Sequence, residues 1–112
     1  MSRTDRVATL IQREIAQIIQ RQMSSSKVGM VSIVSVDVSP DLRNAKVYYS
    51  QIGDYDRTQT QTFLRKSAGF VRGELGKVLH LKTIPKLTFV YDESIERGDR
   101  ILDQLRSLDA SD

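Results

Sequence analysis

The sequence contains no cysteine and no tryptophan, and its single histidine is His80. Without cysteine the chain has no disulfide framework, no thiolate nucleophile and no cysteine-based metal site. A lone histidine leaves no His pair for a zinc site. No apolar run approaches the roughly 18 residues that a membrane span needs. We therefore expect a cytoplasmic protein without a metal, a cofactor or a membrane partner.

Basic residues are unevenly distributed along the 112 residues, which carry a net charge of +3. Residues 56–90 have seven basic and two acidic side chains, and residues 1–27 have five and two, whereas residues 91–112 have three and seven. A basic region beside an acidic one is typical of a protein that places one face against phosphates. A merely solvated surface explains the charge alone equally well.

Apolar spacing predicts an α+β fold in which helices pack on one face of a small three-stranded sheet. A chain of this length makes one domain, residues 1–112, and we expect an ordered core of about 4–108. Ser2 or Thr4 could cap the first helix. The predicted helices are 4–23, a second stretch of about 58–80 and 94–108, and the predicted strands are 30–39, 45–52 and 86–91.

Alternation within the first two strands predicts which side chains face the core. Val34, Val36 and Val38 share one face of the first strand, and the second strand alternates in the same way. The short connection between them predicts an antiparallel hairpin, in which Asn44 tolerates left-handed backbone.

The second helical stretch contains Gly69, Gly73 and Gly76, each of which costs about 1 kcal/mol relative to alanine in a helix. These glycines predict a kink at Ser67-Ala68-Gly69. A break there would expose backbone N–H groups that favour an anion, with basic side chains around it. The apolar side of the stretch is predicted to be Phe63, Leu64, Ala68, Phe70, Val71, Leu75, Val78 and Leu79. The predicted RNA-binding residues are Arg3, Arg6, Arg13, Arg65, Lys66, Ser67, Ala68, Gly69, Arg72, Lys77, Lys82 and Lys86.

No catalytic constellation is evident, so we do not expect an enzyme. His80 has no second residue positioned to use it. The acidic residues Asp92, Glu93, Glu96 and Asp99 lack the spacing of a calcium loop and fit helix capping better. Residues 73–76 match the GxxG loop of KH domains, but Glu74 would oppose phosphates and Leu75 belongs to the apolar stripe.

Four blocks of the sequence resemble the ribosome-binding factor A family. They are RVATLIQREIAQIIQ, VSVDVSPDLRNAKVYYS, SAGFVRGELGKVLHLKTIPKLTFVYDES and RILDQL. The resemblance implies a KH-like fold of type II, ordered α-β-β-α-kink-α-β-α, with an Ala-x-Gly kink between two helices. Ser67 stands here where the family usually has alanine.

The resemblance also implies a ribosome-assembly factor that binds the free or immature small (30S) ribosomal subunit and its 16S rRNA. The family assists late maturation and processing of the rRNA 5′ end, is linked to growth in the cold, and is not enzymatic. Few aromatic residues are available for base stacking, so we expect shape and phosphate position to dominate recognition by a monomer. The alternative is a protein-interaction adaptor that uses the sheet edge or the acidic C-terminal helix.

Overall fold

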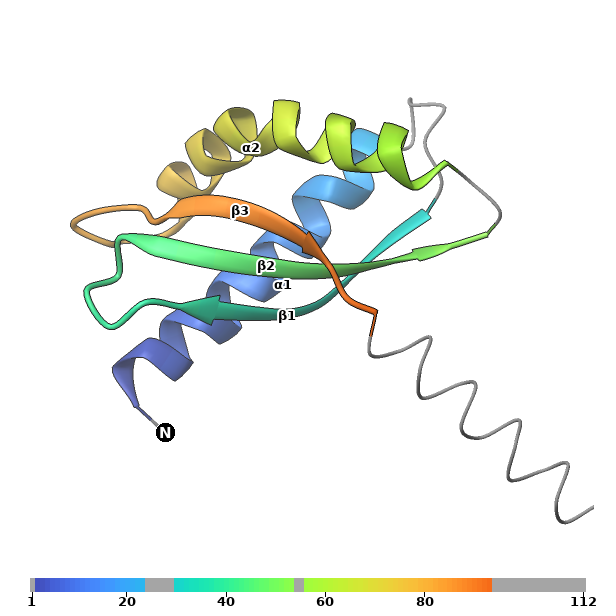
Figure 1. Ribbon diagram of the computed structural model, residues 1–112. Helices are drawn as coiled ribbons and strands as arrows, with labels where there is room; N and C mark the ends of the chain where they lie inside the picture. Colours follow the sequence, from blue (N-terminus) through green and yellow to red (C-terminus); the bar gives the residue numbers. More distant parts are fainter. Residues whose placement is uncertain (1, 24–29, 54–55, 94–112) are drawn as a thin grey trace, which may run out of the picture.

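The structure, a computed structural model, describes residues 2–23, 30–53 and 56–93. Its elements follow one another as a helix, two strands, a helix and a strand (Figure 1). They are α1 (Arg3–Met23), β1 (Met30–Val38), β2 (Asn44–Ile52), α2 (Arg57–Val78) and β3 (Lys86–Tyr91). The sequence predicted each of these within one or two residues at either end, and the predicted helix 94–108 lies outside the described residues.

Side-chain caps define where both helices begin. The hydroxyl of Ser2 accepts a hydrogen bond from the backbone N–H of Asp5 (3.1 Å), and the carboxylate of Asp5 accepts one from the N–H of Ser2 (3.2 Å). This reciprocal pair is a capping box, so Ser2 rather than Thr4 caps α1. The carboxylate of Asp56 caps α2 by accepting from the N–H groups of Thr58 and Gln59.

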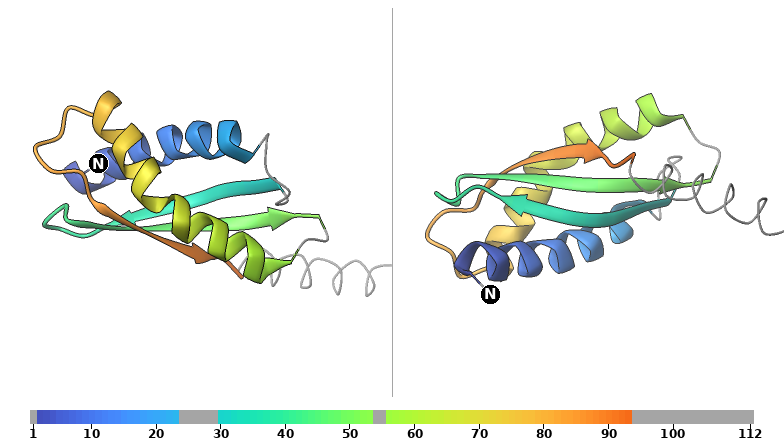
Figure 2. Two further views of the ribbon diagram at one scale, coloured as in Figure 1. Left: turned by 90° about the horizontal axis from the view of Figure 1, so that it is seen from above. Right: turned by 60° about the horizontal axis from the view of Figure 1, so that its bottom comes forward.

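The three strands form a mixed sheet in the order β1-β2-β3. Strand β2 pairs antiparallel with β1, as the short connection between them predicted, and parallel with β3. A parallel pair needs a long crossover, which α2 supplies. Both helices pack on one face of the sheet (Figure 2), which confirms the predicted α+β architecture.

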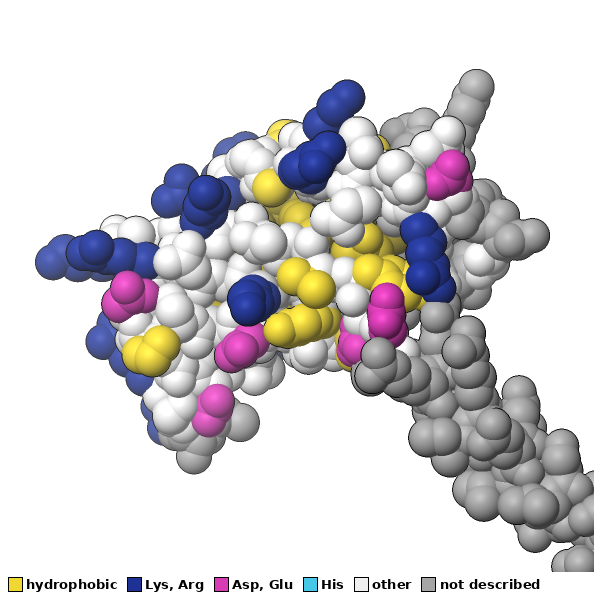
Figure 3. Space-filling view, in the orientation of Figure 1, with side chains coloured by type: hydrophobic (Ala, Val, Ile, Leu, Met, Phe, Trp, Pro, Cys, Tyr) yellow, Lys and Arg dark blue, Asp and Glu magenta, His cyan; other side chains and the backbone are white. Residues whose placement is uncertain are grey.

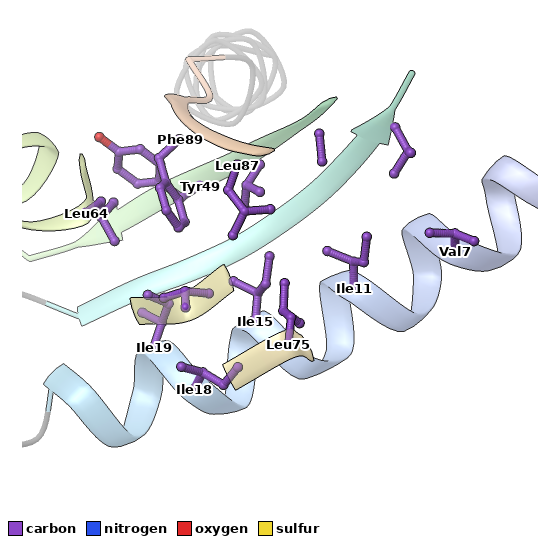
Figure 4. Close-up of a cluster of buried hydrophobic side chains, with 14 residues drawn as sticks. Val7, Ile11, Ile15, Ile18, Ile19, Tyr49, Leu64, Leu75, Leu87 and Phe89 are labelled. Carbon is purple, nitrogen blue, oxygen red and sulfur yellow. The ribbon is translucent and has the colours of Figure 1, made fainter. Parts of the chain in front are cut away.

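One hydrophobic core joins the two helices to that face (Figure 4). Apolar residues at helical spacing on α1 meet alternate residues of β2 and β3, so these three elements contribute their predicted apolar sides. Truncating one such buried aliphatic side chain to alanine typically costs about 2–5 kcal/mol. The buried apolar residues are Val7, Ile11, Ile15, Ile18, Ile19, Val38, Ala45, Val47, Tyr49, Leu64, Val71, Leu75, Leu87 and Phe89.

A β-bulge changes the predicted alternation of β1. The register shifts between Ile33 and Ser35, and Val34 has no partner on β2. Because one extra residue reverses the alternation, Val31 and Ile33 pack against the core before the bulge, and Val36 and Val38 do so after it. The prediction that Val34 shares a face with Val36 and Val38 was therefore wrong.

The hairpin turn places its left-handed residue at Leu42, with φ 62°, rather than at Asn44. Asp41 organises this turn, because its carboxylate accepts hydrogen bonds from the Ser39 hydroxyl (2.6 Å) and the Arg43 N–H (3.0 Å). These hydrogen bonds lower the pKa of Asp41 below its ordinary value. Leu42 also packs against the core, which helps to hold a leucine in this backbone region.

Helix α2 runs without interruption from Arg57 to Val78 and is drawn as one coil in Figure 1. The predicted division into two helices at residues 67–69 is therefore corrected, and no new helix N-terminus is exposed there. Glycine is costly in a helix, but Leu64, Val71 and Leu75 are fully buried on both sides of the predicted kink. Tertiary packing of this apolar face outweighs the weak local propensity.

Candidate nucleic-acid interface

The outer face of α2 carries three glycines, Gly69, Gly73 and Gly76, which lie within roughly 60° of one another around the helix axis. Thr60, Leu64, Val71 and Leu75 define the buried side of the helix, and Gly69 and Gly73 lie roughly opposite by helical geometry. A Cβ atom added at Gly69 or Gly73 would meet nothing within 4 Å. Packing inside the protein therefore does not require glycine at either position, and the helix backbone is accessible to an outside partner.

Basic side chains flank this glycine face on both sides. Arg65 and Arg72 lie to one side of Gly69, and Lys66 and Lys77 lie to the other, all within roughly 80° of it around the helix axis. All four are exposed. The arrangement is suited to a phosphate backbone, because arginine offers a planar fork of donors and lysine a point charge.

Arg72 also ties the loop before β3 to the helix. Its Nε and Nη2 atoms donate hydrogen bonds to the backbone carbonyl of Ile84, at 3.1 and 2.9 Å. An open hollow results between the helix and the loop. It is lined by Gly69, Arg72, Gly73, Lys82, Thr83 and Ile84. The sequence predicted Arg72 as a phosphate ligand, and the structure shows that two of its donors position the loop that carries Lys82.

The GxxG match at residues 73–76 is not a backbone clamp. Leu75 is fully buried, and Glu74 forms an ion pair with Lys77 at 3.0 Å. The Lys77 side chain remains 72% exposed, so this pair is weak and leaves the ammonium accessible to another anion.

The predicted residues Ser67 and Ala68 are less suited to direct contact. Both are half-buried, and Ala68 packs against the core. They occupy the inner half of α2, because a step of one or two residues turns the helix by roughly 100–200°. Of the Ser67-Ala68-Gly69 triplet, only Gly69 is exposed.

The remaining predicted cations lie on other elements. Lys86 begins β3, and its backbone N–H donates to the Arg43 carbonyl (2.8 Å), joining the loop to the hairpin turn. Arg3, Arg6 and Arg13 are exposed on α1. The start of α1, the hairpin turn and the loop before β3 lie at the same end of the molecule in Figure 1. In Figure 3, dark blue side chains gather along the top and left margins, over α2 and that end.

Phe70, which was predicted on the apolar side of the helix, lies on the surface. It is 52% exposed and turned away from the buried face. A second open hollow lies beside it, lined by Ile18, Arg21, Gln22, Phe70 and Glu74. Helical geometry alone could have predicted this exposure, since Phe70 falls roughly 120° around the helix axis from the centre of the buried residues.

The described residues contain neither a group of metal-ligating side chains nor a membrane-spanning helix. Over residues 2–23, 30–53 and 56–93, no three His, Asp or Glu side chains gather in a way that could hold a metal ion. His80 is exposed, while Glu96 and Asp99 of the acidic cluster lie outside these ranges. Neither described helix is long and apolar enough to cross a membrane.

The chain matches a known protein family over most of its length. The family model described as ribosome-binding factor A matches residues 3–105. The chain belongs to the ribosome-binding factor A family. It is 39% identical to the ribosome-binding factor A of Dechloromonas aromatica over 109 residues, which cover 95% of this chain and 89% of that protein. It is 46% identical to that of Nitrosococcus oceani over 101 residues, covering 89% and 80%.

Solved structures of the family share the fold. The crystal structure of ribosome-binding factor A from Thermus thermophilus matches with a TM-score of 0.71 at 16% identity, covering 80% of this chain and 97% of that one. A homology model of the Thermus thermophilus factor, fitted into a cryo-EM map of its complex with the 30S subunit, matches with a TM-score of 0.67 at 16% identity, covering 77% and 91%. The family's structures thus share this helix-and-sheet arrangement, which is consistent with a KH-like domain.

Proposed function

We propose that this protein binds the small (30S) ribosomal subunit and contacts its 16S rRNA through the outer face of α2 and the loop before β3. The observation that carries the proposal is the glycine face of Gly69 and Gly73 with basic side chains on both flanks. Family membership supports the same conclusion, because a Thermus thermophilus member has been fitted into a map of a 30S complex.

The interface suits a sugar–phosphate backbone better than a folded protein surface. A helix without Cβ atoms on one face lets a backbone come close. Lys82 from the loop adds a cation at the hollow beside Gly69. Arg3, Arg6 and Arg13 on α1 would extend the contact to a second rRNA segment. Contacts to phosphates fix the position of the protein on the RNA but do not recognise the base sequence.

The bound factor acts late in subunit maturation, in the cytoplasm, as one domain and as a monomer. By binding one conformation of an rRNA segment more tightly than another, it shifts the population toward the bound form. Holding the segment in this way assists processing of the rRNA 5′ end and delays premature use of the subunit. No bond is made or broken by the factor, so it is not an enzyme.

The adaptor alternative by strand addition is weakened at both edges of the described sheet. Gln12 of α1 donates its side-chain amide to the Val34 carbonyl on β1 (3.1 Å), and Gln61 of α2 donates to the Phe89 carbonyl on β3 (3.0 Å). Each bond occupies an edge carbonyl that an added strand would need. An incoming strand would first have to displace these side chains.

The test is sedimentation of cell extract through a sucrose gradient, with the protein detected in each fraction. We expect the protein to travel with free small subunits and to be absent from assembled ribosomes. Protein that remains at the top of the gradient, or that travels with the large subunit, would contradict the proposed function.

A further inference from the structure

An exposed aromatic ring lies on the basic side of α2. Phe70 is 52% exposed, although an aromatic side chain gains most from burial. Lys66 lies one turn before it and Lys77 two turns after it, within roughly 40° around the helix axis. A phenyl ring between two lysines on an exposed helix face combines apolar area with positive charge.

The hollow beside Phe70 has room and polar groups next to the ring. Ile18, Arg21 and Gln22 of α1 line it together with Phe70 and Glu74 of α2. Gln22 carries an amide, and Glu74 offers a carboxylate that accepts hydrogen bonds. The polar edge of a nucleobase presents donors and acceptors, whereas its flat face is suited to stacking on an aromatic ring.

We propose that Phe70 stacks on an unpaired base of the bound RNA, with the flanking phosphates held by Lys66 and Lys77. The inference rests on the proposed function and deepens it, because it assigns a single-stranded segment rather than a duplex to this part of the interface. Charge complementarity selects this occupant, since the apolar ring lies between cations and a polyanion brings both phosphates and flat bases. A base in a duplex is already stacked and cannot reach the ring.

The test compares binding by Phe70→Leu, Phe70→Tyr and the unchanged full-length protein. Leucine keeps apolar volume and raises helix propensity but removes the aromatic face, so a loss of affinity would not come from unfolding. The probes are purified small subunits, protein-free rRNA extracted from them, and a short single-stranded RNA with its duplex form as reference. Val78→Ala is the matched control, because Val78 is 51% exposed and lies about 12 Å further along the same helix.

We expect F70L to lose roughly five- to 150-fold in affinity for small subunits, protein-free rRNA and single-stranded RNA, the range for removal of one base–aromatic stack. We expect F70Y to bind as the unchanged protein does, and V78A to lose little. Binding by F70L that equals that of the unchanged protein would overturn the stacking proposal but not the proposed function, provided that the unchanged protein binds subunits.

A loss of affinity for subunits but not for protein-free rRNA would mean that Phe70 contacts a ribosomal protein instead. An equal loss of affinity in V78A would indicate a general apolar contact. Both results would overturn the proposal.

Discussion

The guanidinium of Arg72 on α2 is joined to the backbone carbonyl of Ile84 by two hydrogen bonds, from Nε at 3.1 Å and from Nη2 at 2.9 Å. The pair fixes the loop before β3 against the helix and brings Lys82 to the hollow beside Gly69. The proposed interface is therefore built by packing between two segments rather than by a break in one helix. This relationship determines which residues can be exchanged without disturbing the loop.

Arg72→Lys should loosen that loop, because a lysine ammonium cannot reproduce the fork of two donors. We expect faster amide hydrogen exchange across residues 79–84, and weaker binding to small subunits because Lys82 is less well held. Lys82→Ala is the control, since it removes the cation but leaves the anchor. Unchanged exchange in the R72K loop would contradict the positioning role of Arg72.

Gly69→Ala should affect stability and binding in opposite directions. The added Cβ meets nothing within 4 Å in the protein, and alanine is the better helix former, so the free energy of unfolding should rise by about 1 kcal/mol. In the proposed interface the same methyl group would stand where the RNA backbone approaches, so affinity for small subunits should fall. Denaturant unfolding and subunit binding measure the two effects, and a variant that is more stable and binds equally well would remove Gly69 from the interface.

A buried tyrosine connects α2 to the sheet and should titrate late. The Tyr49 hydroxyl donates to the side-chain oxygen of Gln61, whose amide donates to the Phe89 carbonyl. Burial raises the pKa of Tyr49 above its ordinary value of 10.0, so its stabilising effect is complete below that pH and is lost as the pH rises through the folded pKa. In absorbance titration, the Tyr49 hydroxyl should ionise above the ordinary tyrosine pKa of 10.0, and Tyr49→Phe should remove that late component.

Tyr49→Phe tests the same hydrogen bond at neutral pH. The variant leaves the side-chain oxygen of Gln61 without its donor, and we expect a loss of about 1–3 kcal/mol in the free energy of unfolding. Tyr48→Phe, on the opposite face of β2, is the matched control and should change stability by less than about 0.5 kcal/mol. Equal effects of the two variants would show that the Tyr49 hydroxyl contributes nothing specific.

The hairpin turn should weaken in acid. Hydrogen bonds from the Ser39 hydroxyl, which has the larger effect, and from the Arg43 N–H hold the pKa of Asp41 below its ordinary value of 3.8. The stabilising contribution of Asp41 is thus complete above that pH and is lost as the pH falls through the folded pKa. Asp41→Asn should flatten the acid limb of a stability-against-pH curve, and an unchanged limb would argue that Asp41 is not involved.

Much of the fold follows from local patterns. The apolar spacing of α1 and the alternation of β2 and β3 predicted their buried faces, because each repeats regularly over its whole length. The bulge at Val34 could not be predicted, since an extra residue is allowed only by the pairing with β2 and the packing of Ile33 and Val36 against the core.

The candidate site was predicted only in outline. The glycines and cations of α2 were found, but the local cost of glycine suggested a break, whereas burial of Leu64, Val71 and Leu75 keeps one helix. The anchoring role of Arg72 depends on Ile84, which is 12 residues away along the chain, and no local pattern indicates such a contact. The outward position of Phe70 follows from the helical wheel, but its apolar character favoured the buried side.

The central claim is that the basic outer face of α2 binds rRNA phosphates on the small subunit. The most direct measurement is the affinity for purified small subunits over a range of salt concentrations, for the unchanged protein and for Arg65→Gln/Lys66→Gln. We expect log affinity to fall linearly with log salt, and the double variant to bind more weakly with a slope smaller by about 0.7–0.9 for each phosphate that the protein no longer neutralises. Lys46→Gln, on the face of β2 away from the helices, should bind as the unchanged protein does. The account would be contradicted by an affinity that hardly responds to salt, or by a double variant whose affinity and slope match those of the unchanged protein.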